Sequence, residues 1–295
     1  MTPRPKVLFV TDLAYPARGR RYGDEDVLLT SRLREDFDIA LCHPLDAVAL
    51  MDAFDLVVVR NSGPVIHYRE AHEAFREHAL ARRVPVYNPL TGRGDMAGKG
   101  YLPLLTEAGY PVIPTLRYPV VPDRLPAADR YVVKPETGAD SIGLRVLDRS
   151  EVVGLPPGAG EGQLIQPLVD FRYEVSFLHL DGVFRYALYA PDPERRWELE
   201  PYEPTGADLR FARRFVEWNT LDHGIQRVDA CRTRDGELLL VELEDLNPYL
   251  SLDRLPEPVR EDFLTAFGES LRRFAALHPR AGDPGPRRRP PGRTA

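Results

Sequence analysis

One stretch near the end of the chain decides how the rest is interpreted: RVDACRTRDGELLLVELE, from Arg227 to Glu244. An Asp-Gly pair divides it into two segments of β-forming residues, which is the strongest short-range signal for a hairpin. If Asp-Gly is a two-residue loop, counting outward places Asp229 opposite Glu242 and Arg227 opposite Glu244. Because side chains alternate faces with a period of two, all four project from the same face of the hairpin.

Three carboxylates and one guanidinium on one surface are costly to bury without compensating charge. A divalent cation supplies that charge, and Mg²⁺ takes oxygen ligands while keeping substrate phosphates as further ligands. The hairpin therefore predicts an enzyme that handles a nucleotide triphosphate. The alternative is a solvated face with cross-strand Arg–Glu pairs, and a one-residue slip in the loop would scatter the cluster.

The apolar residues of the hairpin favour a partly buried structure over a solvated one. The expected core face carries Val228, Ala230, Leu239 and Val241, and the charged face continues through Cys231, Leu238 and Leu240.

Composition indicates an ordinary globular protein. The chain has 295 residues, 43% of them hydrophobic and 28% charged, and it contains no apolar run near the roughly 20 residues that cross a bilayer. Met1–Lys6 leads into a strand without the apolar stretch of a signal peptide. Cys42 and Cys231 have no metal-binding spacing, and we interpret them as buried thiols in a reducing cytoplasm.

The charge distribution argues against nucleic acid as a partner. The net charge is −6, and the most basic stretch is the tail, residues 281–295, with four arginines and one aspartate. The tail has too little apolar content to fold, so it is predicted to be disordered. Nothing else suggests a basic face for nucleic acid.

The first 90 residues alternate between strand and helix patterns. Such alternation predicts a small parallel α/β domain. Its expected strands span 6–12, 38–42, 55–60 and 84–89, and its helices span 25–36 and 70–83.

The remainder predicts an α+β fold with mostly antiparallel pairing. Helices are expected at 99–109, 207–219 and 258–277, and strands at 131–135, 144–147, 163–169, 173–180 and 183–189, besides the hairpin. A charged segment, 191–206, is either a lid or an acidic surface loop.

A candidate phosphate loop follows the strand 131–135. Lys134 can place a point charge on a phosphate, and the loop from Gly138 to Gly143, with Ser141, lets backbone N–H groups approach phosphate oxygens. A plain glycine-rich hairpin loop is the alternative. The usual nucleotide motifs are absent: the nearest Walker A run, ending at Gly98-Lys99, lacks its first glycine and its Ser or Thr, and no G-x-G-x-x-G follows the first strand.

Together these segments resemble the ATP-grasp superfamily, which includes D-alanine–D-alanine ligase, glutathione synthetase and other carboxylate–amine ligases. The resemblance covers about 88–277. It implies an N-terminal α/β domain (1–90) followed by two α+β subdomains, a small one (91–168) and a large one (169–280), that clamp ATP.

The resemblance also assigns roles to individual residues. Lys99 and Lys134 correspond to the ATP-phosphate lysines, with Ser141 in the loop over the phosphates. Gln166 to Val169 resembles the hinge that reads adenine, and Glu174 the ribose-binding glutamate. Asp229, Glu242 and Glu244 match the Mg²⁺ (or Mn²⁺) ligands, and Arg227 matches the arginine that steadies phosphate and oxyanion.

The chain departs from the family pattern at several positions. The family often has Asn where Glu244 stands, and Asn247 is a possible substitute ligand. Pro167 lacks one hinge N–H. No lysine follows the hinge hairpin, so we assign the missing cation to Arg196, with Arg195 as the alternative.

The resemblance implies an ADP-forming ligase that joins a small carboxylate, such as an amino acid, to an amine through an acyl phosphate. Intramolecular ring closure of the cycloserine type and a non-catalytic ATP-binding regulator remain alternatives. Related ligases are often dimers, so a homodimer is one option. Among the remaining residues, Cys231 lacks a base to make it a nucleophile. Four arginines at strand ends are either carboxylate binders or solvated: Arg18, Arg20, Arg21 and Arg60.

Overall fold

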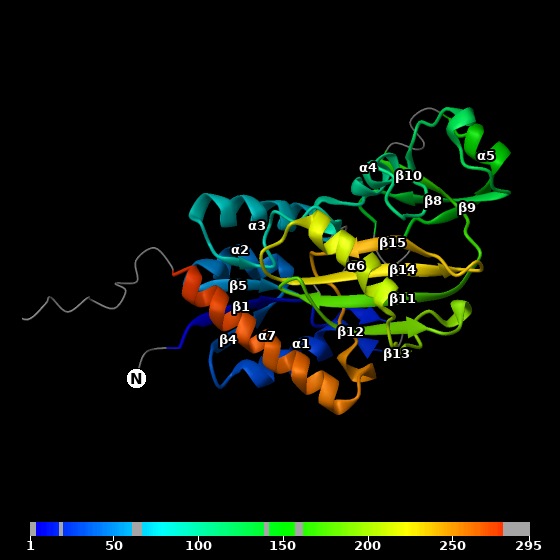
Figure 1. Cartoon of the computed structure of the whole chain (residues 1–295). Coiled ribbons are helices and arrows are strands. Elements are labelled where there is room, and N and C mark those ends of the chain that lie inside the picture. The colour runs from blue at the N-terminus through cyan, green and yellow to red at the C-terminus, as the bar shows by residue number, and fades with distance from the viewer. Residues whose placement is uncertain (1–3, 18–19, 61–66, 139–141, 157–161, 280–295) are drawn as a thin grey trace, which may run out of the picture.

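The computed structural model describes residues 4–17, 20–60, 67–138, 142–156 and 162–279 (Figure 1). Ser141, Arg18 and the tail 281–295 lie outside these ranges, so the predictions for them stay predictions. Three sheets of four or five strands, with helices packed on them, make up most of the described fold. This is the predicted combination of a parallel α/β unit with antiparallel α+β units.

The N-terminal sheet is parallel throughout, as predicted. Its order is β4 (Asp38–Cys42), β1 (Lys6–Val10), β5 (Leu56–Val59), β6 (Val86–Tyr87). The associated helices are α1 (Tyr22–Leu33), α2 (Ala47–Leu50) and α3 (Arg69–Arg82), and a short ribbon pairs β2 (Pro16–Ala17) with β3 (Arg20–Arg21).

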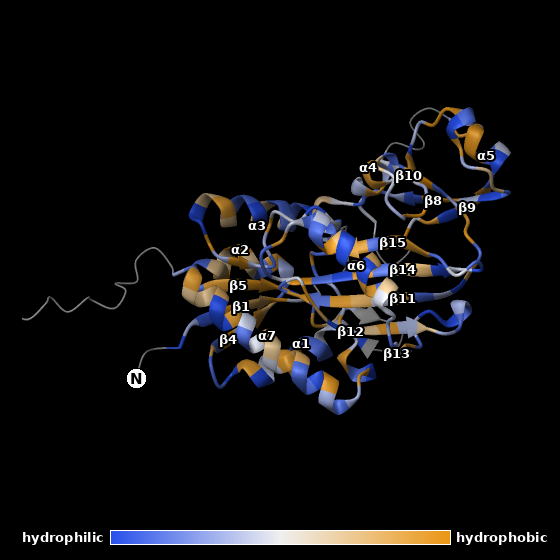
Figure 2. Cartoon of the chain, in the orientation of Figure 1, coloured by the Kyte–Doolittle hydropathy of each residue, from blue (hydrophilic) through white to orange (hydrophobic). Residues whose placement is uncertain are grey.

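Both faces of this sheet are buried, which explains why its strands are continuously hydrophobic (Figure 2). Val7 and Phe9 of β1 belong to a core shared with α1, whereas Leu8 and Val10 belong to a second core under α2 and α3. The single strand β1 therefore joins two separate cores.

The small subdomain is built on an antiparallel sheet. Its strand order is β7 (Leu116–Arg117), β10 (Gln163–Pro167), β8 (Arg130–Pro135), β9 (Arg145–Asp148), with α5 (Arg149–Val153) following β9. Tyr131, Val133, Val152 and Ile165 form the centre of its own apolar core.

The large subdomain carries a five-stranded antiparallel sheet. The order is β13 (Glu200–Pro201), β12 (Val183–Ala190), β11 (Phe171–Leu180), β14 (Ile225–Thr233), β15 (Leu238–Glu244). Two helices, α4 (Tyr101–Glu107) and α6 (Gly206–Asn219), contribute Leu102, Leu105 and Phe215 to its core. Helix α4 begins two residues after Lys99, so Lys99 lies in the turn before the helix.

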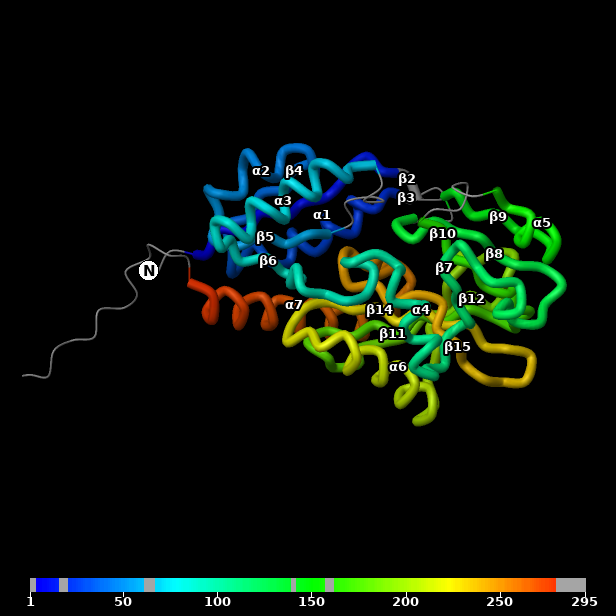
Figure 3. Tube along the Cα trace, turned by 90° about the horizontal axis from the view of Figure 1, so that it is seen from above, coloured from blue at the N-terminus to red at the C-terminus, as the bar shows by residue number. Residues whose placement is uncertain are grey.

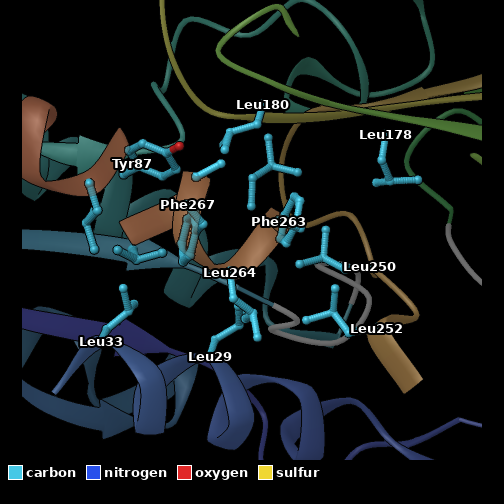
Figure 4. Packing of buried hydrophobic residues seen from close by; sticks show 14 of the residues in the cluster. Leu29, Leu33, Tyr87, Leu178, Leu180, Leu250, Leu252, Phe263, Leu264 and Phe267 are labelled. Atoms are coloured by element: carbon cyan, nitrogen blue, oxygen red, sulfur yellow. The ribbon is translucent and has the colours of Figure 1, made fainter. Parts of the chain in front are cut away.

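The last helix, α7 (Glu257–Leu277), joins the N-terminal domain to the large subdomain through a shared core. It has 21 residues and runs beside α1 (Figure 3). Phe263 and Phe267 of α7 pack in one core with Leu29 of α1 and Leu178 of β11 (Figure 4). Within the described ranges no helix is long and apolar enough to cross a membrane.

Candidate active site

The β14–β15 hairpin brings the predicted carboxylates together. Asp229 pairs with Glu242 and Arg227 with Glu244, as the sequence predicts. The predicted two-residue loop is wrong, however, because Thr233 already pairs with Glu237 around a three-residue loop, with Gly236 at φ 92°. A β-bulge at Val241 absorbs the resulting one-residue shift and restores the predicted register at the charged end.

The three-residue loop also makes the predicted faces of β15 wrong between the loop and the bulge. Leu238 and Leu240 are buried in the core of the large subdomain, whereas we expected them on the charged face. Val241, expected in the core, lies beside Glu242 on a cavity wall. The apolar and charged faces exist as predicted, but their membership changes between the loop and the bulge.

Two of the carboxylates, Asp229 and Glu244, form ion pairs with Arg227. Its Nε donates to Asp229 Oδ1 at 2.9 Å, and its Nη2 lies 2.5 Å from Glu244 Oε1. Ser176 of β11 donates its hydroxyl to Asp229 Oδ1 at 2.6 Å. Burial raises the pKa of Glu244 to about 8, and the negative charges of Asp229 and Glu242 act in the same direction. Arg227 opposes the increase.

Glu242 is paired with Lys99, whose Nζ donates to its Oε1. Burial raises the pKa of Glu242, but Lys99, Lys134 and Arg227 outweigh it and hold that pKa below its usual value. The Lys99 backbone is itself fixed, because its N–H donates to the carbonyl of Glu136 at 2.8 Å. Glu242 is therefore ionised and surrounded by cations.

A cavity of about 270 Å³ lies between the small and large subdomains. Apolar side chains from both subdomains line it, including Ile113, Val132, Leu144 and Phe171. Seven of the predicted site residues line it as well: Lys99, Lys134, Gln166, Val169, Glu174, Arg196 and Glu242. The described lining residues do not include Arg227, Asp229 or Glu244. Asp229 lies opposite Glu242 on β14, and the pair of Arg227 and Glu244 lies two residues further along the hairpin.

Lys134 is a partly buried cation in this cavity wall. Burial lowers its pKa to about 8, with Lys99 and Arg196 acting in the same direction and Glu242 against them. No carboxylate of the described chain lies within ion-pair distance of its ammonium, whereas Lys99 has Glu242. An anion in the cavity would supply the missing partner.

The predicted hinge, residues 166–169, offers few backbone donors to a base. Pro167 has no N–H, and the N–H of Leu168 donates to the carbonyl of Arg130 at 2.9 Å. The side chain of Gln166 is buried and donates to Thr115 Oγ1 at 2.8 Å. Val169 follows at the cavity wall, which leaves it as the next backbone donor along the hinge.

Arg196 reaches the cavity, and Arg195 does not. Arg196 Nε donates to Glu174 Oε2 at 2.7 Å, and burial raises the pKa of Glu174 although Arg196 opposes the increase. Arg195 pairs instead with Asp192 and Glu198 on the surface.

Two carboxylates that sequence reasoning missed support the hairpin end. Asp245 accepts hydrogen bonds from the N–H groups of Gly94 and Met96 at 2.8 and 2.7 Å. Asp95 accepts in return from the N–H of Asp245 at 2.7 Å. A Cβ on Gly94 would lie 2.5 Å from the carbonyl of Leu243. The lack of a side chain at Gly94, inside the incomplete Walker A stretch, thus permits close packing on β15. The glycine spacing of that stretch was the sequence signal that could have indicated this contact.

Both predictions for Arg60, as a binder of a substrate carboxylate and as a solvated residue, are wrong. The side chain is only 2% exposed, so it is neither solvated nor open to a substrate. Its Nη2 donates to Glu25 Oε1 at 3.0 Å and its Nη1 to the carbonyl of Pro248 at 2.7 Å.

The three predicted metal ligands fit Mg²⁺ in kind, since all are carboxylate oxygens on one face of the hairpin. In the described residues, however, no three His, Cys, Asp or Glu side chains are gathered closely enough to hold a metal ion. Lys99 pairs with Glu242, and Arg227 pairs with Asp229 and Glu244 instead. A metal ion bound through Glu242 Oε1 would therefore compete with Lys99.

Comparison with known proteins yields structural matches only. No family model matches the sequence, and a search of curated proteins finds no match. D-cycloserine synthetase DcsG has a TM-score of 0.69 at 21% identity, over 90% of this chain and 99% of that one. The D-alanine–D-alanine ligase from Bacillus anthracis, complexed with ATP, has a TM-score of 0.61 at 13% identity, over 93% and 97%.

The description of a third matching structure includes the name of the fold. ATP-grasp ligase PsnB, complexed with a precursor variant, Mg and ADP, has a TM-score of 0.58 at 18% identity, over 91% of this chain and 99% of that one. The chain has the ATP-grasp fold. At these identities the likeness concerns the fold, so the resemblance in sequence is confirmed as far as the architecture.

Proposed function

We propose that the chain is an ATP-dependent ligase that forms an amide or similar C–N bond. The carrying observation is Lys134, a partly buried ammonium without a carboxylate partner among the described residues, which lines a cavity with both apolar and charged side chains. A phosphate would stabilise its charged form, since an opposite charge nearby favours ionisation.

The described side chains divide the cavity into parts with different chemistry. Apolar residues and the hinge suit adenine, and Glu174 suits ribose hydroxyls. Lys99 and Lys134 suit phosphates, and Asp229, Glu242 and Glu244 would hold Mg²⁺, which when bound neutralises charge on the β- and γ-phosphates. Arg227 and Arg196 would stabilise negative charge that develops on the reacting groups.

The overall reaction would consume a carboxylate, an amine and ATP and release ADP and phosphate, with an acyl phosphate as the activated carboxylate. The fold likeness to D-cycloserine synthetase favours a second candidate, in which the amine and the carboxylate belong to one molecule. Mass spectrometry separates the two, because ring closure lowers the substrate mass by one water, whereas intermolecular ligation joins two masses.

The test is Mg²⁺-dependent ADP release in the presence of amino acids and small carboxylates. We expect one substrate to stimulate release, and Glu242→Gln to abolish it, because the variant removes a charged oxygen from the centre of the cluster. Glu237→Gln is the matched control, since it lies on the same hairpin but is exposed. ATP binding without stimulated release by any substrate would favour the regulator; absence of ATP binding would refute the nucleotide site itself.

A further inference from the structure

Arg60 and Glu25 form a buried ion pair that the proposed chemistry does not use. They are 2% and 7% exposed, and both belong to the N-terminal domain. A third group, Asp26, lies 3.4 Å from Arg60 Nε and accepts from Thr11 Oγ1 at 2.6 Å. Replacing a buried ion pair by apolar residues is often neutral for stability, so its presence calls for a role other than stability.

Both members of the pair hold the loop that follows β15. Glu25 accepts the N–H of Leu250 at 2.9 Å with one oxygen and the N–H of Leu252 at 3.1 Å with the other. Arg60 donates to the carbonyl of Pro248 at 2.7 Å. The backbone of the loop is thus fixed at three points by side chains of another domain.

The same loop holds Arg227 from the opposite side. Arg227 Nη1 donates to the carbonyl of Tyr249 at 2.7 Å, between the residues that Arg60 and Glu25 hold. The Tyr249 ring packs on Tyr22 of α1, with centroids 4.7 Å apart. Arg227 has its other donors on Asp229 and Glu244, so the Tyr249 carbonyl is the contact that fixes its guanidinium relative to the N-terminal domain.

We propose that Glu25 and Arg60 are positioning residues that set the orientation of Arg227 through the Tyr249 carbonyl. The inference rests on the proposed ligase function for its kinetic consequence, and on geometry alone for its structural one. Neither residue lines the cavity between the subdomains, so we expect the pair to affect the chemical step more than ATP binding.

The test compares Glu25→Gln and Arg60→Lys with a matched control. Arg60→Lys keeps the charge but lacks the forked guanidinium that bridges Glu25 and Pro248. Asp208→Asn is the control, because Asp208 also forms a buried ion pair, with Arg232 on β14 at 2.6 Å, but has no contact with the loop. Displacement of a catalytic group by about 1 Å costs on the order of 100-fold in rate.

Three measurements decide the outcome. In Glu25→Gln we expect the amides of Leu250 and Leu252 to exchange with solvent at least about tenfold faster, since they lose a charged acceptor. In both variants we expect the Arg227 Nε–H resonance, assigned with Arg227→Lys, to shift or broaden. For kinetics, kcat should fall about 10- to 100-fold while the KM for ATP changes by less than about threefold.

An unchanged Arg227 resonance, or a kcat for Arg60→Lys equal to that of Asp208→Asn, would overturn the proposal. The spectroscopic measurements need no turnover. If wild type shows no ADP release but the Arg227 resonance responds to both variants, positioning stands and the ligase function fails. If release occurs and the resonance does not respond, the ligase stands and positioning fails.

Discussion

Lys134 and Lys99 occupy the same cavity but are stabilised in different ways. Lys99 has Glu242 as a partner, whereas Lys134 has the charges of its surroundings and none within ion-pair distance among the described residues. A buried charge without a partner costs free energy in the folded state. The site therefore contains one cation balanced by the protein and one that a ligand would balance.

Lys134→Met should raise the stability of the free protein and weaken nucleotide binding. Removing an unpaired, partly buried charge favours folding, while the loss of a charged contact to phosphate lowers affinity for a non-hydrolysable ATP analogue about tenfold or more. Calorimetric titration and thermal unfolding measure the two effects, with Arg130→Met, an exposed residue on the same strand, as control. A lower melting temperature together with intact affinity would contradict this interpretation.

His179 of β11 predicts an acid dependence of stability. It is 3% exposed, and burial lowers its pKa from 6.5 to about 4. The unfolded chain therefore binds a proton below about pH 6.5 that the folded protein does not bind until pH 4, so the free energy of unfolding falls as pH decreases between these values, by up to about 3 kcal/mol. Urea unfolding of His179→Gln should show a shallower decline over this interval; an identical pH profile would exclude the effect.

At the scale of elements, some features of the β14–β15 hairpin can be predicted from the sequence and others cannot. The pairings of Asp229 and Arg227 are predictable because polar and apolar residues alternate on either side of them. The three-residue loop and the bulge at Val241 are not, because each shifts the alternation by one residue and the two shifts cancel at the charged end. The contact between Lys99 and Glu242 was equally inaccessible, because it joins segments that are distant in sequence.

The glycine-rich segment before Lys99 should tolerate no side chain where it meets β15. Gly94→Ala would bring a Cβ to 2.5 Å from a backbone carbonyl, so we expect a loss of about 1–3 kcal/mol in the free energy of unfolding. Gly206→Ala is the control, because its Cβ would meet only Arg210 Nη1 at 3.4 Å at the start of α6, and alanine is a better helix former than glycine. Equal stabilities of the two variants, measured in urea, would show that the segment yields without cost.

At the scale of the whole molecule, the apolar cores are distributed unequally among the N-terminal domain and the two subdomains. One core joins the N-terminal sheet, α7 and the large subdomain, whereas the small subdomain has a core of its own. The order of the elements was accessible from sequence, but the return of α7 to the N-terminal sheet was not, since an amphipathic pattern does not name its partner. The cavity lies where the small subdomain meets the larger body.

This distribution predicts that the small subdomain opens more readily than the rest. Amide hydrogen exchange in β8, β9 and β10 should be faster than in β1, β5 and β11, because a smaller core gives a lower free energy of local opening. A nucleotide that contacts both walls of the cavity should slow exchange in the small subdomain more than in the large sheet. Uniform exchange across all three sheets, with and without nucleotide, would contradict the expected difference.

The environment of Lys134 also has a chemical consequence. An ordinary lysine, with a pKa near 10.4, is neutral in fewer than about one molecule in a hundred at pH 8. With a pKa of about 8, roughly half of the Lys134 side chains carry a free amine at that pH. Amine-directed acylating reagents small enough to enter the cavity should therefore modify Lys134 ahead of the exposed Lys6. Occupation by a phosphate-bearing ligand should protect Lys134, which gives a covalent marker of the site.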